Sequence, residues 1–353
     1  MKSISLVVSI IFCLGCNRAG SNNSSSEEVN QSKEVVCFVY HRFGDDRFPS
    51  TNVSLNDFKA HLSYLKENEF RVLTFDAALD YLKSDDRAQK TAVITIDDGY
   101  DSFYKNGLPL LEQFGFPATL FINTETVGGS DYMDWEDLKD AQSRKIEIGN
   151  HTHSHAYFLN QPESERYENF KSELQLTQKL IRENLGTTPT TFAYPYGELD
   201  EQMKEIVKSV GFKGAAAQNS GVIHSASDLL RCPRFPMSEF YSAPDKFESK
   251  ANMHSLNILE EKPYSFIKPA NTDKPKLQLI VKNADLNLGS INCFIQGSEC
   301  NISRETIDEE TSQITIMPQS AITDRRRFLY TITLQDKSGQ WYWFSHLWID
   351  SSK

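Results

Sequence analysis

Short apolar runs alternate with amphipathic segments along residues 34–260. The runs "VVCFVY" (35–40), "TAVITI" (91–96) and "ATLFI" (118–122) have few polar positions, as expected of strands that are covered on both faces of a sheet. Between such runs, apolar residues recur at helical spacing after residues that can cap a helix, such as Ser54. This βα rhythm predicts a barrel-like α/β fold, with any site at the carboxyl ends of the strands.

The pattern changes after residue 260. Residues 261–276 contain three prolines without periodicity and are predicted to be a linker. Residues 277–353 form short strand-like segments rich in β-branched and aromatic residues, which predicts a small all-β, sandwich-like domain. In "WYWFSHLWI" alternate side chains face opposite sides of a strand, so we expect these aromatic residues to pack in cores rather than to form one sugar-binding platform.

The first residues resemble an export signal. Lys2 precedes the apolar run "ISLVVSIIFCLG", which is too short to span a bilayer, so residues 1–15 are expected to be a signal peptide. The run ends in "CLGC", which resembles a bacterial lipobox with lipidation at Cys16, and the polar residues 16–33 then form a flexible tether. The alternative is a simple signal peptide cleaved elsewhere, because Cys13 occupies the position where such boxes usually carry leucine.

Charge and cysteine content agree with an exported protein that does not bind nucleic acid. The formal net charge of -11 disfavours nucleic acid or an anionic membrane surface as the main partner. Four cysteines remain after the first sixteen residues. We expect Cys293 and Cys300 to form a disulfide, and Cys37 to be a buried thiol.

Two clusters of polar residues follow predicted strands and carry the candidate chemistry. Asp97 and Asp98 end the run "ITIDD", and "HTHSH" follows "IEIGN" with His151, His153 and His155. Two histidines and one carboxylate make an open metal site that leaves room for water and a substrate oxygen. A second carboxylate would remain free as a base. Spacing does not decide whether His151 pairs with His153 or with His155, because a helical turn and an extended loop give different answers.

Three motifs together resemble the polysaccharide deacetylases of carbohydrate esterase family 4. They are "TIDDG" (95–99), "HTHSH" (151–155) and "FAYPYG" (192–197), and the resemblance covers residues 35–240. It implies a distorted (β/α) barrel that removes N-acetyl groups from a polysaccharide. The third motif is similar to that of the subgroup acting on poly-N-acetylglucosamine.

The resemblance also implies a role for each motif residue. Asp98, His151 and His155 would bind one divalent metal ion, and Asp97 would act as the base. The backbone N–H of Tyr196 would stabilise the oxyanion that develops in the transition state. Zinc is the expected metal, with iron, cobalt or nickel as alternatives.

The third motif departs from the commoner family pattern. Many members have arginine where this chain has Ala193, and that arginine orients the base. We expect Arg234 to supply the guanidinium instead, with Arg231 as the alternative. Trp135 is a candidate apolar wall for the sugar or the acetyl methyl group, and a core position is the equally weighted alternative.

The general acid is also displaced. Family members usually carry this histidine late in the chain, and neither His224 nor His254 lies in a convincing motif. His41 directly follows the first predicted strand, and a closed barrel brings its first strand beside its last. We therefore predict that His41 protonates the leaving amine.

The sequence thus predicts a metal-dependent hydrolase of the N-acetyl groups of N-acetylglucosamine units in an envelope or exported polysaccharide. The alternatives are an O-acetyl esterase on a polysaccharide such as xylan, and a non-catalytic glycan-binding lipoprotein. The lipid anchor at Cys16 would hold the protein on a membrane. Because Asn17 rather than aspartate follows, the outer membrane, facing the periplasm or the cell surface, is the expected location.

Overall fold

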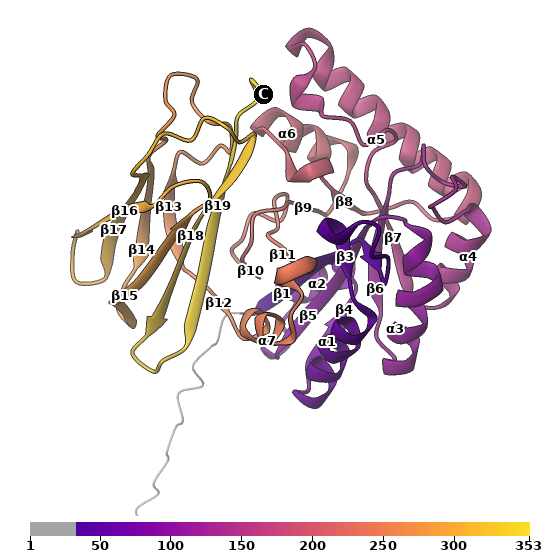
Figure 1. Cartoon of the computed structure of the whole chain (residues 1–353), viewed down its shortest axis with the longest axis horizontal. Helices are drawn as coiled ribbons and strands as arrows, with labels where there is room; N and C mark the ends of the chain where they lie inside the picture. The colour runs from indigo at the N-terminus through magenta and orange to yellow at the C-terminus, as the bar shows by residue number, and fades with distance from the viewer. Residues whose placement is uncertain (1–32) are drawn as a thin grey trace, which may run out of the picture. The chain divides into compact units, whose positions relative to one another are not determined.

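A curled nine-stranded sheet dominates the N-terminal part of the structure (Figure 1). The structure is a computed structural model that describes residues 33–353, so the predicted signal peptide, Cys16 and nearly all of the tether lie outside the described residues. The strand order is β10-β1-β5-β6-β7-β8-β9, while β4 pairs with β5 and β11 pairs with β1. The strands are β1 Glu34–Tyr40, β4 Arg71–Leu73, β5 Thr91–Asp98, β6 Ala118–Ile122, β7 Ile146–Asn150, β8 Thr191–Ala193, β9 Gly214–Ala216, β10 Val222–His224 and β11 Phe235–Pro236.

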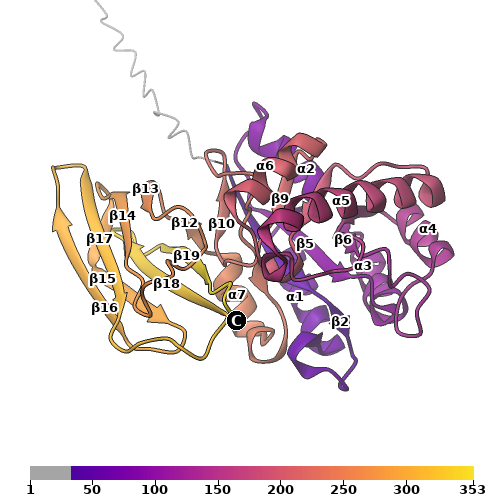
Figure 2. The same cartoon turned by 90° about the horizontal axis from the view of Figure 1, so that it is seen from above.

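Helices follow most of these strands, as the βα rhythm predicts. In both Figure 1 and Figure 2, α3, α4 and α5 lie along the outer side of the sheet. The side chain of Ser54 caps α1 by accepting a hydrogen bond from the backbone N–H of Asp57. Within residues 33–353, none of the helices is both long enough and apolar enough to cross a membrane. The helices are α1 Leu55–Glu67, α2 Phe75–Lys83, α3 Leu108–Phe114, α4 Trp135–Ser143, α5 Glu163–Leu185, α6 Glu201–Val210 and α7 Pro244–Ala251.

The sheet curls far enough to bring its two ends toward each other. Neighbouring strands from β1 through β9 pair in parallel, and β11 adds a further parallel pairing on β1. The segment between β9 and β11 pairs with β9 through Cys232 and Ala216. The last strands therefore return to the first, and the prediction of a distorted (β/α) barrel is confirmed.

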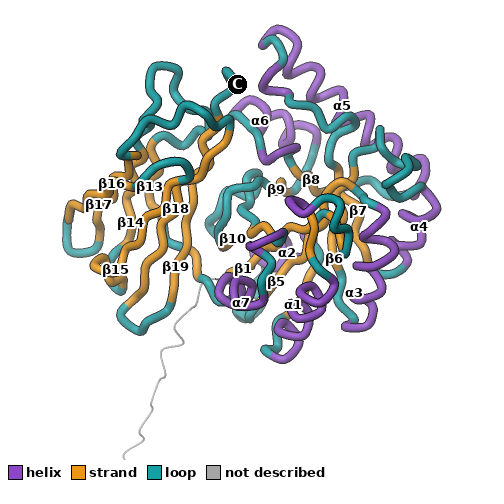
Figure 3. The backbone as a smooth tube through the Cα atoms, in the orientation of Figure 1, coloured by secondary structure: helices purple, strands orange, loops and turns teal. Residues whose placement is uncertain are grey.

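Two four-stranded sheets form a sandwich in the C-terminal part, which consists of strands and connecting turns (Figure 3). Their orders are β12-β19-β18-β15 and β13-β14-β17-β16, and the all-β prediction is confirmed. A disulfide joins Cys293 on β15 to Cys300 on β16. The strands are β12 His254–Ser255, β13 Ile258–Lys262, β14 Leu277–Lys282, β15 Leu286–Ile295, β16 Cys300–Thr306, β17 Thr311–Pro318, β18 Arg327–Asp336 and β19 Trp341–Ile349.

The sandwich recruits strands from before the predicted linker. β12 pairs with β19 and β13 pairs with β14, although the sequence pattern places 254–260 in the first domain and 261 onward in a linker. Both strands are short and β13 is mostly polar, so apolar periodicity does not mark them. The exact domain boundaries stay predictions.

Strand β19 is covered on both faces, which explains its mostly aromatic and aliphatic sequence. Tyr342 and Trp348 pack into the core between the two sandwich sheets. On the opposite face, Trp343 packs against the core cluster around β1, and Leu347 and Ile349 pack with the cluster around α5 and α6. The sandwich therefore shares its apolar interior with the α/β part instead of being tethered to it.

His61 on α1 gives the fold a testable pH dependence. The ring is buried, its Nδ1 lies 3.0 Å from the Tyr40 hydroxyl, and its Nε2 lies 2.7 Å from the carbonyl oxygen of Ser242. Burial lowers the pKa of His61 from 6.5 to about 4, against the opposing effect of the Ser242 carbonyl.

Since the unfolded chain binds this proton below pH 6.5 and the folded chain only near pH 4, stability is lost as the pH falls through this window. We expect His61 to account for a loss of about 2 kcal/mol between pH 7 and pH 4.5. Denaturant unfolding of the wild type and of His61→Gln, which keeps a donor and an acceptor without titrating, measures this difference. Equal pH slopes in the two proteins would contradict the assignment.

Candidate active site

The residues predicted to be functional converge on the carboxyl edge of the curled sheet. His41 follows β1, Asp97 and Asp98 end β5, and His151 follows β7. Arg234 immediately precedes β11. A cleft of about 730 Å³ opens there, and His41, Asp98, His155, Tyr196, Arg234 and Arg327 are among its lining residues.

Asp97 and Arg234 form a buried ion pair at the base of this cleft. Two hydrogen bonds of 2.7 and 2.8 Å join the guanidinium nitrogens to both carboxylate oxygens, and both side chains have 0% exposure. The guanidinium also donates to the Ala217 carbonyl at 3.0 Å and to the Thr95 hydroxyl at 3.1 Å. Arg234 is thus the residue whose guanidinium pairs with the Asp97 carboxylate. The sequence favoured Arg234 over Arg231 but did not exclude Arg231.

This pairing determines the charge state of Asp97. Burial acts to raise the pKa of Asp97, but the positive charge of Arg234 and the nearby His151 outweigh it and hold the pKa below its ordinary value. The carboxylate is therefore ionised at neutral pH. Each of its oxygens keeps one further lone pair beyond those bound by Arg234.

Asp98, His151 and His155 form a second cluster in the cleft. The Nε2 atoms of the two histidines are 3.1 Å apart, and Oδ1 of Asp98 lies 3.5 Å from that of His151 and 3.6 Å from that of His155. Nδ1 of His151 lies 2.7 Å from the carbonyl oxygen of Ala193, to which it donates its proton. Nε2 of His151 consequently has a free lone pair that faces the other two residues.

The donor set of this cluster fits a divalent metal ion. Two imidazole nitrogens bound to a tetrahedral zinc ion at ~2.1 Å stand about 3.4 Å apart, which is close to the separation observed between the two Nε2 atoms. One ligand atom from each residue lies within 4.8 Å of the others. The Ala193 carbonyl fixes the tautomer and orientation of His151, as expected for a ligating histidine.

Several residues of the site have positive φ angles without being glycine. These values are 76° for Asp98, 66° for Thr152, 54° for His155 and 58° for Tyr196. Such conformations cost stability and cluster at functional sites in proteins. They also explain the unresolved histidine spacing, because the "HTHSH" loop is neither a helical turn nor an extended strand.

Glu173 on α5 holds the "HTHSH" loop in this shape. Its carboxylate accepts hydrogen bonds from the backbone N–H groups of His153 and Ser154 at 3.1 and 2.9 Å. The His153 ring turns to Thr124, with 2.9 Å between Nδ1 and the hydroxyl oxygen. His153 therefore contributes to the loop structure and is absent from the group that could hold a metal.

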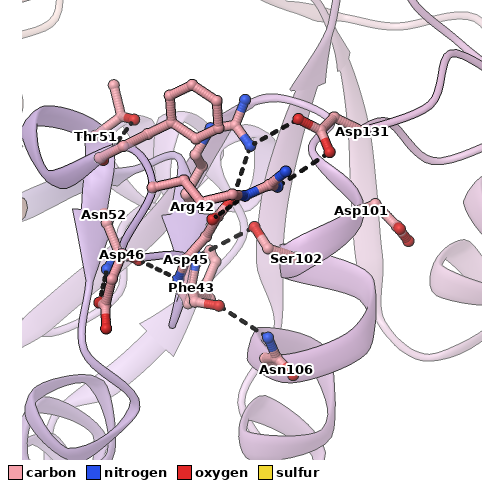
Figure 4. Close-up of polar contacts among 12 residues, drawn as sticks. Arg42, Phe43, Asp45, Asp46, Thr51, Asn52, Asp101, Ser102, Asn106 and Asp131 are labelled. Carbon is pink, nitrogen blue, oxygen red and sulfur yellow. Dashed lines mark hydrogen bonds and ion pairs between the residues drawn. The ribbon is translucent and has the colours of Figure 1, made fainter.

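The segment after His41 is fixed by a polar network (Figure 4). Arg42 forms an ion pair with Asp45 at 2.9 Å, and the backbone N–H of Asp45 donates to the side chain of Asn52 at 2.9 Å. Asn106 binds the carbonyl of Phe43 at 2.9 Å. These contacts join the short strands β2 Arg42–Phe43 and β3 Asn52–Val53 to the helix after β5, and so fix where His41 enters the cleft.

Tyr196 is held by aromatic and charged neighbours. Its ring stacks on Tyr157 with 3.7 Å between centroids and lies edge-on to His155 at 4.4 Å. Arg327 on β18 of the sandwich donates a hydrogen bond of 2.9 Å to the Tyr196 carbonyl. Burial raises the pKa of the Tyr196 hydroxyl to about 12, so the ring stays neutral.

The remaining candidates lie outside the cleft. Trp135 begins α4 and packs against the core, so the predicted wall for the sugar gains no support from its position. His254 pairs with Glu34 at 2.7 Å, and His224 lines a different cavity. Arg231 pairs with Glu261, away from Asp97.

Sequence reasoning missed the contribution of the sandwich to the cleft. Gln296, Arg327 and Leu329 all line it, although they lie 99 or more residues beyond the last motif, which ends at residue 197. Tyr100 lines it as well, directly after the two aspartates. Tyr100 adjoins a motif and could be found from the local sequence. The positions of Gln296, Arg327 and Leu329 depend on how the sandwich packs, which no local sequence pattern shows.

Comparisons with known proteins agree with this geometry. Residues 84–215 match the family model described as "Polysaccharide deacetylase", a range that includes all three motifs but neither His41 nor Arg234. The chain is 24% identical over 222 residues to a poly-beta-1,6-N-acetyl-D-glucosamine N-deacetylase of Staphylococcus aureus, covering 60% of this chain and 76% of that protein.

Two solved structures are similar as well. IcaB from Ammonifex degensii has a TM-score of 0.56 and 26% identity, covering 63% of this chain and 98% of that one. A Streptococcus pyogenes deacetylase, PplD, in complex with acetate, has a TM-score of 0.57 at 18% identity and covers 62% and 99%. The latter similarity concerns the fold alone.

Proposed function

The chain carries a polysaccharide deacetylase domain, and from this premise we propose that it hydrolyses the N-acetyl groups of N-acetylglucosamine units in a polysaccharide. The observation that carries the proposal is the pair of adjacent aspartates at the end of β5. Asp97 is locked to Arg234, whereas Asp98 faces His151 and His155. Such a division provides one carboxylate for a metal ion and one for a proton.

The choice of substrate follows the curated relative, whose name specifies poly-beta-1,6-N-acetyl-D-glucosamine. A neutral polymer also suits an acidic chain, because its net charge of -11 neither attracts nor repels uncharged sugar units. The "FAYPYG" motif supports the same choice, because it is similar to that of the subgroup acting on poly-N-acetylglucosamine, and its Tyr196 lines the cleft.

Asp98, His151 and His155 would hold one divalent ion, with zinc as the first candidate. When bound, such an ion polarises the acetyl carbonyl and lowers the pKa of a water molecule to about 7. Asp97 takes the proton of the attacking water, while Arg234 keeps the carboxylate ionised and oriented.

The remaining residues act on the two ends of the amide bond. As the water oxygen bonds to the acetyl carbon, the backbone N–H of Tyr196 stabilises the negative charge on the carbonyl oxygen. The C–N bond then breaks, and His41 gives a proton to the leaving nitrogen, so that the products are acetate and a glucosamine amine. His41 lines the same cleft as Asp98, His155 and Tyr196.

Incubation with N-acetylglucosamine oligomers and with acetylated xylan, each assayed for acetate, tests the proposal. We expect acetate from the oligomers at a rate well above that from xylan. Faster release from xylan would instead identify an O-acetyl esterase, which can use the same residues. Absence of acetate from both, with metal bound, would leave a glycan-binding protein.

Replacement of His41 by alanine tests the general acid. We expect turnover on N-acetylglucosamine oligomers to fall by about 10²-fold, because the leaving amine loses its proton donor. Metal content and thermal unfolding should stay at their wild-type levels, since His41 is outside the metal cluster. His224→Ala is the matched control, because His224 is also partly buried but lies outside the cleft. Activity lost in the control and kept in His41→Ala would reverse the assignment.

We also propose that the protein is exported and anchored through a lipid on Cys16, with the outer membrane as its location. The support is the sequence "CLGC" after an apolar run and Asn17 after the cysteine. We test this by fractionating cells that express the wild type or Cys16→Ser. The wild type is expected in the membrane fraction and the variant in a soluble exported fraction. Unchanged membrane association of the variant would contradict the anchor.

A further inference from the structure

A second groove lies beside the catalytic cleft, along the seam between the α/β part and the sandwich. Its volume is about 710 Å³, similar to that of the cleft itself. Pro236, Gln296 and Leu329 line both spaces, so the two are adjacent. None of the three sequence motifs contributes to this groove.

Large exposed aromatic side chains from both parts of the structure line the groove. Phe240 and Tyr241, in the helical turn η5 Glu239–Tyr241, are 86% and 51% exposed. Phe294 on β15 of the sandwich is 63% exposed. A cluster of exposed aromatic residues in a groove commonly marks a binding site.

The floor of the groove is rigid and partly polar. The indole N–H of Trp343 donates to the Ser220 hydroxyl at 3.0 Å, and the Trp343 ring lies edge-on to Phe235 at 5.3 Å. Thr331 and Thr333, two positions apart on β18, present hydroxyl groups on the same face. Aromatic planes beside hydroxyl and amide groups match a pyranose ring, which has an apolar face and a polar edge.

We propose that this groove binds the sugar units next to the one being deacetylated, so that the sandwich is part of the substrate site and the enzyme acts within a chain. The identity of the sugar in this inference rests on the proposed function. The binding of further sugar units rests on the shape and lining of the groove. The adjacency to the catalytic cleft favours a glycan over a peptide or a second protein copy, because the units next to the one held in the cleft lie within reach of the groove.

The test compares N-acetylglucosamine dimers with hexamers. In the wild type, kcat/KM should be higher for the hexamer, mostly through KM. In Phe240→Ala and Phe294→Ala, the ratio of hexamer to dimer kcat/KM should fall by about 5–10-fold each, the loss of roughly one aromatic stacking contact. Trp341→Ala is the matched control, because Trp341 is an exposed aromatic residue of the sandwich outside the groove. An unchanged ratio in both groove variants would overturn the proposal.

A binding measurement distinguishes a failure of this inference from a failure of the proposed function. Calorimetry of Asp97→Asn with the hexamer needs no turnover, and the added change Phe294→Ala should weaken binding by a similar factor. If the wild type releases no acetate but this difference in binding is present, the groove stands and the deacetylase proposal fails. If Phe294→Ala instead converts a wild-type dimer into a monomer, a second copy covers the groove and the glycan proposal is wrong.

Discussion

Replacing Asp97 with asparagine is expected to lower the turnover of the folded, metal-loaded protein by about 10³-fold. The amide of asparagine keeps the shape of the side chain but cannot take a proton from water. The metal content should stay at the wild-type level, because Asp97 pairs with Arg234 and is not among the three candidate ligands. Steady-state kinetics with metal analysis of the same sample checks both statements.

The same change should also lower stability, which the experiment must separate from catalysis. The guanidinium of Arg234 is fully buried and would lose its counter-charge, a change that typically costs about 3–5 kcal/mol. Circular dichroism at the assay temperature shows whether the variant is folded. A folded variant with a near-normal rate would show that Asp97 is not the base.

Removal of the metal is the second change with a large expected effect. Chelation should abolish acetate release, and His155→Ala should lower both metal content and activity, because a site with three protein ligands holds its ion poorly with two. Readdition of zinc should fully restore the activity of the chelated wild type but only partly restore the activity of the variant. Inductively coupled plasma analysis and the acetate assay give the two readouts.

His153→Ala is the matched control for the metal ligands. His153 belongs to the same loop, yet its ring contacts Thr124 and not the cluster. The control should retain metal and most of its activity. Equal losses of metal in His153→Ala and His155→Ala would contradict the ligand set. It would then be undecided again whether His153 or His155 binds the metal together with His151.

The sequence predicted those parts of the site that depend on local order. Asp97 and Asp98 end a β-branched run, and strands of a parallel sheet bring their carboxyl ends to one edge, so their convergence with His151 followed from the strand pattern. Arg234 was favoured because it follows Pro233 in a rigid, non-helical segment, and His41 required the further argument that a barrel returns to its first strand. The pairing of β11 with β1 supplies that proximity.

Other features could not be predicted because they depend on tertiary packing. The left-handed backbone of Thr152 depends on contacts across the loop, because a β-branched residue does not ordinarily adopt it. Arg327 and Phe294 reach the cleft and the groove only because β19 buries both of its faces. Trp135 is aromatic and packs, partly buried, against the core, and its sequence position at a helix start is compatible with either role.

The most direct test of the account is the appearance of free amine on an N-acetylglucosamine hexamer incubated with the zinc-loaded protein. We expect primary amine and acetate to form in equal amounts, as hydrolysis of an amide requires, and expect both to form about 10³-fold more slowly with Asp97→Asn. Acetate from O-acetylated substrates without any amine from the hexamer would contradict the proposed reaction. Amine formation at the same rate in Asp97→Asn would contradict the proposed role of the aspartate pair.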